Sequence, residues 1–116
     1  MNRRIKLDDI GREPFRVFFP AGVLSGILGV ALWPLYFTGC VRLYPGPAHA
    51  HIMAFGLFGA FILGFLGTAL PRLLSAQPLG IGKVALLLAL HLAMVASYAA
   101  QSFIWGDSIF LILLAL

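Results

Sequence analysis

The chain has 116 residues and a net charge of +4, and 61% of its residues are hydrophobic while only 10% are charged. Soluble domains are about half apolar and a quarter charged, so this composition excludes water as the solvent for most of the surface. The positive charge does not indicate nucleic-acid binding, because the Lys and Arg residues gather before and between the hydrophobic runs. The single cysteine, Cys40, excludes an internal disulfide and a cysteine-rich zinc or iron–sulfur site.

The hydrophobic runs predict an all-α protein, namely a polytopic bundle of transmembrane helices behind a polar N-terminal segment at residues 1–14. A spanning helix needs about 20 residues, because ~30 Å of hydrocarbon is crossed at about 1.5 Å per residue. Residues 15–37, 48–70 and 84–103 therefore predict three complete spans, and residues 108–116 predict a truncated fourth. We expect the sequence to be the N-terminal part of a longer chain, whose remaining helices pack on this bundle within the lipid bilayer.

Prolines and interfacial residues mark the expected ends of the spans. Pro34 is expected to kink or end the first span, and Pro71 is expected to stop the second. Trp105 is expected at the interfacial exit of the third span, with Asp107 or Ser108 as the N-cap of the fourth.

Basic residues predict the orientation of the bundle. One side of the membrane holds the N-terminal basic cluster between Arg3 and Arg16 together with Arg72 and Lys83, whereas the other side holds only Arg42. By the positive-inside rule, we expect the N-terminus to be cytoplasmic. The start of the second span then lies at the outer face.

Small residues on the second span predict close helix packing. Lipid gives helices no hydrophobic reason to associate, so contacts between small residues must hold them together. At about 100° per residue, Gly56, Ala60 and Gly67 fall on one stripe, and His49 falls on the same side of the helix. The second span is therefore expected to pack tightly against its neighbours.

Two histidines, His49 and His51, open the second span and are candidate ligands for haem or a metal ion. Two residues apart on a regular helix, they point about 200° from each other, and His51 shares its side with Phe55, Phe58 and Phe65. They cannot bind one metal ion together unless the helix is unwound there. Otherwise they serve different sites, or only one of them is a ligand, or they are hydrogen-bonded interfacial residues.

A third histidine, His91, lies in the middle of the third span, where ionisable groups are costly and usually functional. We expect it roughly 15 Å from His49 and His51 along the membrane normal, far beyond the ~2 Å bonds of a single metal ion. His91 is then a ligand at a second site or a partner in an interhelical hydrogen bond. The residues of a hydrolase triad, a carboxylate pair or a phosphate-binding loop are not recognisable, so hydrolysis and nucleotide-driven functions are not supported.

Two stretches of the chain match a known pattern. Residues 14–19 read Pro-Phe-Arg-Val-Phe-Phe, and residues 49–56 read His-Ala-His-Ile-Met-Ala-Phe-Gly, followed at residues 64–71 by Gly-Phe-Leu-Gly-Thr-Ala-Leu-Pro. They resemble the F-R-x-F-F, H-A-H-E-M-x-F-G and G-F-L-x-T-A-x-P motifs of the NnrS family. Members of this family are haem- and copper-containing bacterial membrane proteins linked to nitric oxide and nitrosative stress. The resemblance covers essentially the whole chain and the N-terminal portion of the family.

The chain departs from the family pattern at two places. Ile52 stands where the family usually has Glu, which removes a carboxylate that could orient a ligand or carry protons. Residues 72–75, Arg-Leu-Leu-Ser, replace the family's N-W-x-G pattern. Both departures leave the histidines in place.

The resemblance implies an inner-membrane protein that relieves nitric-oxide stress during or around denitrification, with nitric oxide as a candidate partner. Haem and copper are the implied cofactors, with His51 as the first candidate ligand, His49 as the second, and His91 as a ligand at a second site or a polar partner. The aromatic residues that share the side of His51 would wall an apolar pocket; they are Phe55, Phe58 and Phe65.

Two other functions compete with this interpretation. One is a metal-free membrane module, either a helical subunit or a transporter fragment, whose glycine stripe packs against partners. The other is a relative of the haem–copper oxidase subunits, which also hold haem between membrane helices. Whether the chain catalyses a reaction is left open.

Overall fold

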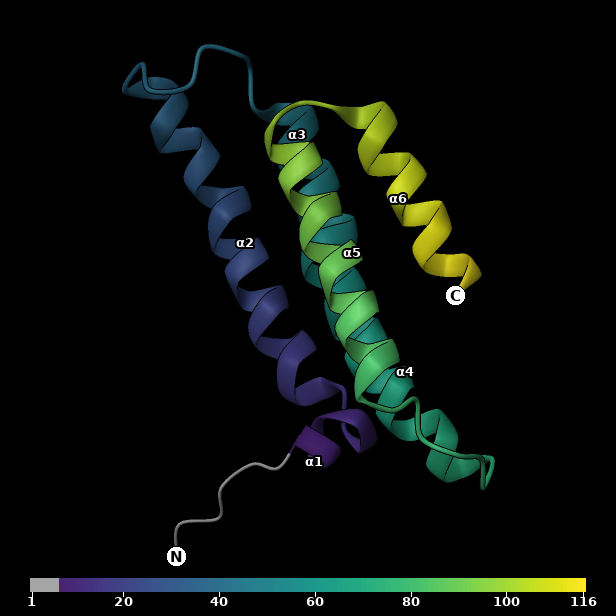
Figure 1. Cartoon of the computed structure of the whole chain (residues 1–116). Helices are drawn as coiled ribbons and strands as arrows, with labels where there is room; N and C mark the ends of the chain where they lie inside the picture. The colour runs from purple at the N-terminus through teal and green to yellow at the C-terminus, as the bar shows by residue number, and fades with distance from the viewer. Residues whose placement is uncertain (1–6) are drawn as a thin grey trace, which may run out of the picture.

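The computed structural model describes residues 7–116, and all regular structure within that range is helical (Figure 1). The elements in chain order are α1 (Leu7–Arg12), α2 (Phe15–Phe37), α3 (Gly46–His51), the π-helix η1 (Ile52–Phe58), α4 (Gly59–Leu73), α5 (Ile81–Ala99) and α6 (Phe103–Ala115). Of the polar segment predicted at residues 1–14, residues 1–6 lie outside the described range.

The long helices confirm the predicted membrane bundle. α3, η1 and α4 run on from one another as a single helix, Gly46–Leu73, which we call the second-span helix. This helix, α2 and α5 are each long and apolar enough to cross a membrane, and α6 is a shorter apolar helix. The chain is therefore an all-α membrane protein with three complete spans and a shorter fourth helix.

Pro34 and Pro71, which were expected to kink or end spans, both lie inside helices. The prediction that Pro71 stops the second span is wrong, because α4 continues beyond it and the N–H of Leu74 donates to the carbonyl of Leu70 at 2.9 Å. A proline in the last turn removes only one backbone donor, so the turn still closes around it. α2 likewise continues past Pro34 and ends shortly before Gly39, whose φ of +85° is readily adopted by glycine.

The predicted end of the third span is also wrong. α5 ends four residues earlier than expected, at Ala99, and the chain reverses through a short turn into α6. Ser102 is the N-cap residue of α6, so three residues expected at or before its start lie inside this helix, namely Trp105, Asp107 and Ser108. The turn contains neither Gly nor Pro. Gln101 makes the reversal with a φ of +64°, and its side-chain amide donates to the carbonyl of Tyr44 at 3.2 Å.

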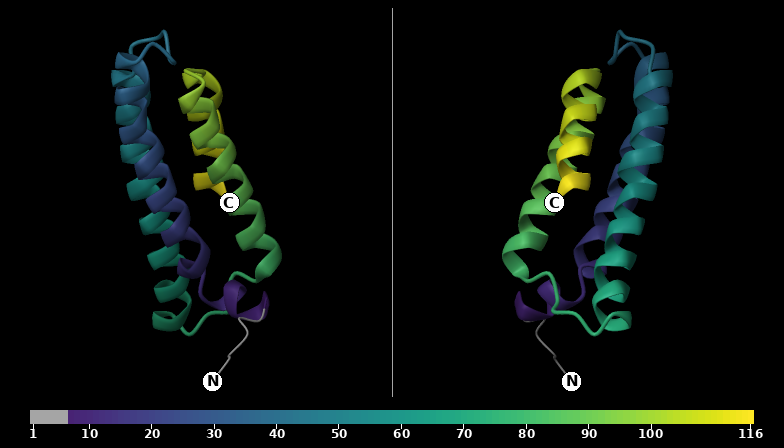
Figure 2. Two further views of the ribbon diagram at one scale, coloured as in Figure 1. Left: turned by 90° about the vertical axis from the view of Figure 1, so that its left-hand side faces the viewer. Right: turned by 90° about the vertical axis from the view of Figure 1, so that its right-hand side faces the viewer.

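Glycines bring α2 close to the second-span helix, as the stripe of small residues predicts. A methyl group added at Gly22 would lie 3.2 Å from the Cβ of Ala60, and one added at Gly64 would lie 3.0 Å from the Cβ of Phe18. Figure 2 shows α2 and this helix side by side along their length, with α6 running back along α5. The three long helices and α6 thus form one bundle, in which neighbouring helices are held together by close packing.

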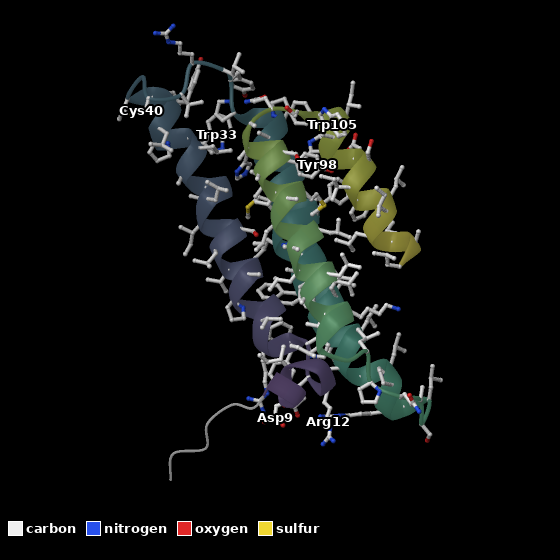
Figure 3. The ribbon with its side chains drawn as sticks, in the orientation of Figure 1. Asp9, Arg12, Trp33, Cys40, Tyr98 and Trp105 are labelled. Atoms are coloured by element: carbon white, nitrogen blue, oxygen red, sulfur yellow. The ribbon has the colours of Figure 1, made fainter. Side chains whose placement is uncertain are left out.

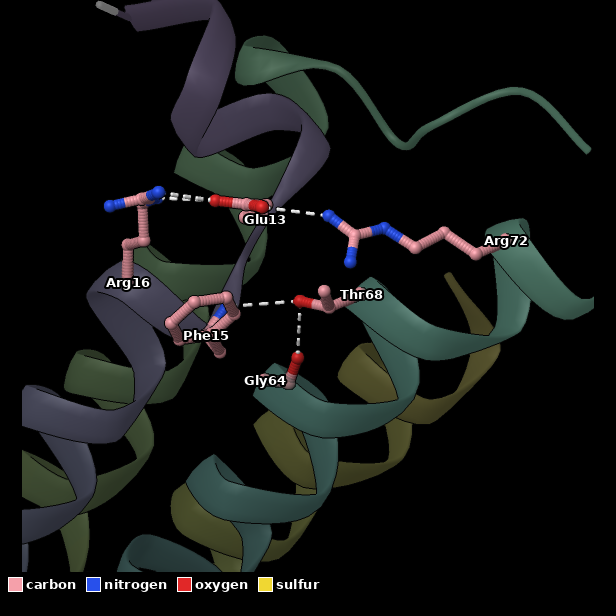
Figure 4. Close-up of polar contacts among 6 residues, drawn as sticks. All are labelled: Glu13, Phe15, Arg16, Gly64, Thr68 and Arg72. Atoms are coloured by element: carbon pink, nitrogen blue, oxygen red, sulfur yellow. Dashed lines mark hydrogen bonds and ion pairs between the residues drawn. The ribbon is translucent and has the colours of Figure 1, made fainter. Parts of the chain in front are cut away.

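Polar residues join α2 to α4 at the end of the molecule where α1 lies (Figure 4). The carboxylate of Glu13 accepts hydrogen bonds from Arg16 at 2.6 Å and from Arg72 at 2.7 Å. These bonds to Arg72 and Arg16 hold the pKa of Glu13 below its usual range. Beside them, the backbone N–H of Phe15 donates to the hydroxyl of Thr68 at 3.3 Å. We call this group of contacts the Glu13 clamp.

Candidate functional site

The His-Ala-His cluster lies in α3, at the end of the bundle opposite α1. Both histidines have regular α-helical geometry, and the π-helical segment begins only at Ile52. Trp33 and Tyr98 lie at the same end of the bundle, whereas Asp9 and Arg12 lie at the other end (Figure 3). The helix is therefore not unwound at the cluster, and the two side chains diverge as the spacing predicts.

His49 faces α2. Its Nδ1 atom is 2.8 Å from the carbonyl oxygen of Gly29, and its ring lies edge-on to Trp33 with centroids 5.9 Å apart. The absence of a side chain at Gly29 makes room for Met53, because a methyl group there would lie 3.1 Å from the Sδ atom of Met53. His49 and Met53 thus both lie against the same glycine of α2.

His51 faces α5 and α6. Its Nδ1 atom is 2.7 Å from the carbonyl oxygen of Pro47, within its own helix. Its ring lies among three aromatic rings, with centroid distances of 4.9 Å to Tyr98, 4.9 Å to Phe103 and 5.9 Å to Phe55. His51 therefore sits in an aromatic environment contributed by the second-span helix, α5 and α6.

The hydrogen bonds of these two histidines determine which ring nitrogen is free. A carbonyl oxygen can only accept, so the Nδ1 atoms of His49 and His51 each carry the proton and donate it. In the neutral ring, Nε2 then presents a lone pair. A histidine that binds a metal usually donates its other ring N–H to a carbonyl or carboxylate in this way, which fixes the tautomer and the ring orientation. Both residues thus have the tautomer that a ligand requires.

His91 lies elsewhere in the bundle. Its side chain is 0% exposed, and neither ring nitrogen has a hydrogen-bond partner among the described residues. It contacts Phe18 edge-on, with ring centroids 6.2 Å apart. Tyr98, which contacts the ring of His51, lies roughly 10 Å further along α5 at about 1.5 Å per residue. His91 therefore belongs to a site separate from the His-Ala-His cluster.

A cavity of about 260 Å³ lies beside His91 between the second-span helix, α5 and α6. We call it the His91 cavity. Its other lining residues are all apolar: Ala54, Phe55, Gly59, Ile62, Leu63, Met94, Phe110, Leu113 and Leu114. His91 is the one polar side chain in this lining.

The three phenylalanines expected to wall one pocket are not brought together. Phe55 contacts the ring of His51 and also lines the His91 cavity. Phe58 is 60% exposed, and Phe65 lines a different groove near Phe15 and Arg72 at the opposite end of the bundle. Phe65 lies ten residues beyond Phe55, roughly 15 Å further along the helix at about 1.5 Å per residue. Phe55 and Phe58 both lie in η1, where the wider turn of a π-helix departs from the regular 100° projection.

Several residues near the sites were not singled out from the sequence. Tyr98 is one of them: its hydroxyl donates to the carboxylate of Asp107 at 2.8 Å, and its ring packs on His51. Phe103 and Phe110 complete the aromatic surroundings of His51 and Phe55 from α6. No sequence signal places α6 against α3, because that contact depends on the turn after α5.

Ligands for a metal ion are sparse in the bundle. Within residues 7–116, no three side chains of His, Cys, Asp or Glu come together in a group that could hold a metal. A closed site such as structural zinc needs four such ligands. Only centres with one or two protein ligands, such as haem iron with an axial histidine, fit what the described residues offer.

Comparison with known proteins gives one match. A family model described as NnrS protein matches residues 10–116, which include all three histidines and every helix after α1. Comparisons with curated proteins and with solved structures give no match.

Proposed function

Because the chain belongs to the NnrS family, we propose that this membrane protein serves the response to nitric oxide with haem and copper held near its outer-end histidines. The observation that carries the proposal is the hydrogen bonding of the His-Ala-His cluster. Each imidazole donates Nδ1–H to a backbone carbonyl, so that Nε2 is the free ligand atom of both rings. Because the two rings face different helices, they support two centres rather than one.

His51 is the residue that we assign to haem. Its ring lies among Phe55, Tyr98 and Phe103, and aromatic and apolar side chains suit the hydrophobic face of a tetrapyrrole. In this role His51 binds iron through Nε2, while the carbonyl of Pro47 holds the ring in one orientation. The haem, when bound, supplies iron chemistry toward a small ligand such as nitric oxide.

His49 is the residue that we assign to copper. Imidazole and thioether groups both bind copper, and His49 and Met53 lie against the same glycine, Gly29. These are two ligands, so further ligands would come from outside the described residues. Among the three histidines, His91 is left out of both centres because it lies in its own cavity and a different layer of the bundle.

The placement in the cell follows from the distribution of charge. The Glu13 clamp, with Arg16 and Arg72, lies at the same end of the bundle as α1, while the connector that carries Arg42 lies at the other end. We infer that the first end is cytoplasmic and that the membrane is the bacterial inner membrane. Lipid and further helices of a longer chain would cover the exposed apolar faces, which include Ile104 and Leu111 of α6.

A metal-free membrane module is the second candidate. It is favoured by the close glycine contacts between α2 and the second-span helix, which hold the bundle together without any metal. In this interpretation His49 joins α3 to α2, and His51 packs α3 on α5.

Spectra and metal analysis distinguish these two functions. The natural full-length protein, purified in detergent, should show a Soret band in oxidised and reduced visible spectra and should contain copper. The variant His51→Ala should lose the Soret band and keep copper, whereas His49→Ala should lose copper and keep the Soret band. Ser97→Ala, on an exposed face of α5, is the matched control and should change neither. A wild-type protein without a Soret band and without copper contradicts the proposal and leaves the metal-free module.

A further inference from the structure

Beyond the proposed haem and copper centres, we propose that the His91 cavity binds an uncharged, membrane-soluble molecule about the size of a substituted benzene ring. This molecule carries a hydroxyl or carbonyl oxygen that pairs with the imidazole of His91. Two independent features support the site. One is the pair of unpartnered nitrogens of His91, and the other is an open space kept free of side chains by Gly59.

The first feature is the unsatisfied imidazole. A neutral imidazole has one N–H donor and one lone-pair acceptor, and buried polar groups of this kind are nearly always paired. His91 is 0% exposed, and neither of its nitrogens has a partner among residues 7–116. The ring borders a cavity but its nitrogens are covered, so a small rotation that exposes one nitrogen would let a molecule in the cavity pair with it. The ligand therefore needs one hydrogen-bonding group at the position of the ring.

Water and ions do not match this cavity. A buried water needs two to four polar partners, and apolar cavities stay dry. Here His91 is the only polar side chain in the lining, so a water would keep most of its hydrogen-bonding capacity unused. An ion would need an opposite charge at hydrocarbon depth, and no charged side chain lines the cavity. The occupant is therefore uncharged and mostly apolar.

The volume limits the size of the occupant. An engineered apolar cavity of ~150 Å³ in another protein holds benzene. The His91 cavity, at about 260 Å³, has room for such a ring with short substituents. A tetrapyrrole is far larger than this. The cavity is therefore not the haem site proposed at His51, and its ligand is a separate small molecule.

The second feature is the glycine in the cavity wall. A methyl group added at Gly59 would meet nothing within 4 Å, unlike one at Gly22, Gly56 or Gly64, where neighbouring helices press close. Gly59 therefore borders open space rather than a helix contact. It follows directly after η1, whose residues Ala54 and Phe55 also line the cavity, and π-helical segments occur often at functional sites.

The cavity can be reached from the membrane. Ile62 and Leu114 line it and are 56% and 62% exposed, on a surface that faces hydrocarbon rather than water. A ligand dissolved in the bilayer can therefore enter sideways between α4 and α6. A charged or strongly polar molecule from the aqueous phase has no comparable path among the described residues.

The test uses phenol and toluene as probes, because they have similar size and differ in the hydroxyl group. The natural full-length protein, labelled with ¹⁵N-histidine and held in detergent, is titrated with each probe. The His91 signals are assigned by their disappearance in His91→Leu. Phenol should shift both ¹⁵N signals of His91, and the phenol-to-toluene affinity ratio should fall by roughly two- to tenfold in His91→Leu, as expected for one lost hydrogen bond. The partition of the probes into micelles affects both proteins equally, so its effect cancels when this ratio is compared between them.

A second variant tests the site without altering the histidine. Gly59→Leu should fill the cavity and abolish saturable binding of both probes, while the matched control Gly82→Leu, at an exposed glycine of α5 with open surroundings, should bind as the wild type does. Three results each overturn the proposal: an unchanged affinity ratio in His91→Leu, undiminished binding in Gly59→Leu, or His91 nitrogens that are both hydrogen-bonded in the probe-free protein. The visible spectrum, recorded on the same samples, reports on the haem proposal separately.

Discussion

The contact between α2 and α4 at Gly64 allows a quantitative prediction. A methyl group added at Gly64 would lie 3.0 Å from the Cβ of Phe18 and 3.1 Å from both the Cα of Phe15 and the ring of Phe19. Because one of these atoms is backbone, no side-chain rotation can relieve the crowding, and the two helices must move apart. Gly64→Ala is therefore an overpacking substitution, which typically costs about 1–3 kcal/mol.

The higher helix propensity of alanine offsets little of this packing cost in a membrane. In water, alanine gains up to about 1 kcal/mol over glycine inside a helix. Membrane helices, however, are already formed before they associate, so the separated helices benefit from alanine as much as the bundle does. Gly64→Ala should consequently lower the free energy of unfolding by the whole overpacking cost of about 1–3 kcal/mol, with the loss coming from the α2–α4 contact.

Reversible unfolding in mixed micelles of a mild and a denaturing detergent measures this change. The matched control is Gly82→Ala in α5, where an added methyl group meets nothing within 4 Å, and the change there should stay within about 0.5 kcal/mol. Equal effects at the two glycines, or a stabilised Gly64→Ala, would refute the argument that close approach at Gly64 holds α2 on α4.

Three further predictions concern single polar or buried contacts. Because the pKa of Glu13 is lower in the folded protein, its stabilising effect is present above the unfolded pKa and disappears as the pH falls through the folded pKa. Between pH 7 and pH 3, the free energy of unfolding should therefore fall less in Glu13→Gln than in the wild type. Tyr98→Phe removes the hydrogen bond to Asp107 and should lower the free energy of unfolding by about 1–2 kcal/mol in the mixed-micelle assay, whereas an unchanged value would mean that the bond contributes nothing. Ile52→Glu would place a carboxyl group at a site that is 0% exposed among apolar side chains, and should cost at least ~2 kcal/mol in the same assay unless a partner group outside the described residues accepts it.

Most of the bundle could be predicted because hydrocarbon imposes a simple rule on composition and length. The three long runs each reach about the length of a span, and the structure confirms them as helices. The ends of the helices were harder to predict, since Pro71 lies inside a helix and no glycine or proline marks the chain reversal at Gln101. A local signal cannot predict a turn whose φ of +64° is accompanied by a long-range bond to Tyr44.

The candidate sites were predictable only as far as regular helix geometry holds. The divergence of His49 and His51 follows from their spacing within α3 and is confirmed. The grouping of Phe55 with Phe58 and Phe65 fails for two reasons. The rise of the helix carries Phe65 roughly 15 Å beyond Phe55, and Phe55 and Phe58 lie in η1, a π-helix that no residue type in that segment specifies. The His91 cavity could not be predicted, since it arises between side chains of three elements that are distant in sequence.

Phe55 joins the two sites, and this leads to a last prediction. Its ring contacts His51 on one side, at 5.9 Å between centroids, and lines the His91 cavity together with Phe110, 4.5 Å away, on the other. A molecule in the cavity must therefore pack against a ring that also packs on the proposed haem ligand. Phe55→Leu should weaken phenol binding and also shift the Soret band of the full-length protein.

The neighbouring phenylalanine provides the control. Phe58 belongs to the same π-helical segment but is 60% exposed, so Phe58→Leu changes size and hydrophobicity equally without touching either site. It should leave phenol affinity and the Soret band as in the wild type. If Phe55→Leu weakened phenol binding with no change in the visible spectrum, the His91 cavity would be independent of the His51 site. A change in both measurements would instead mean that the single side chain of Phe55 supports both sites.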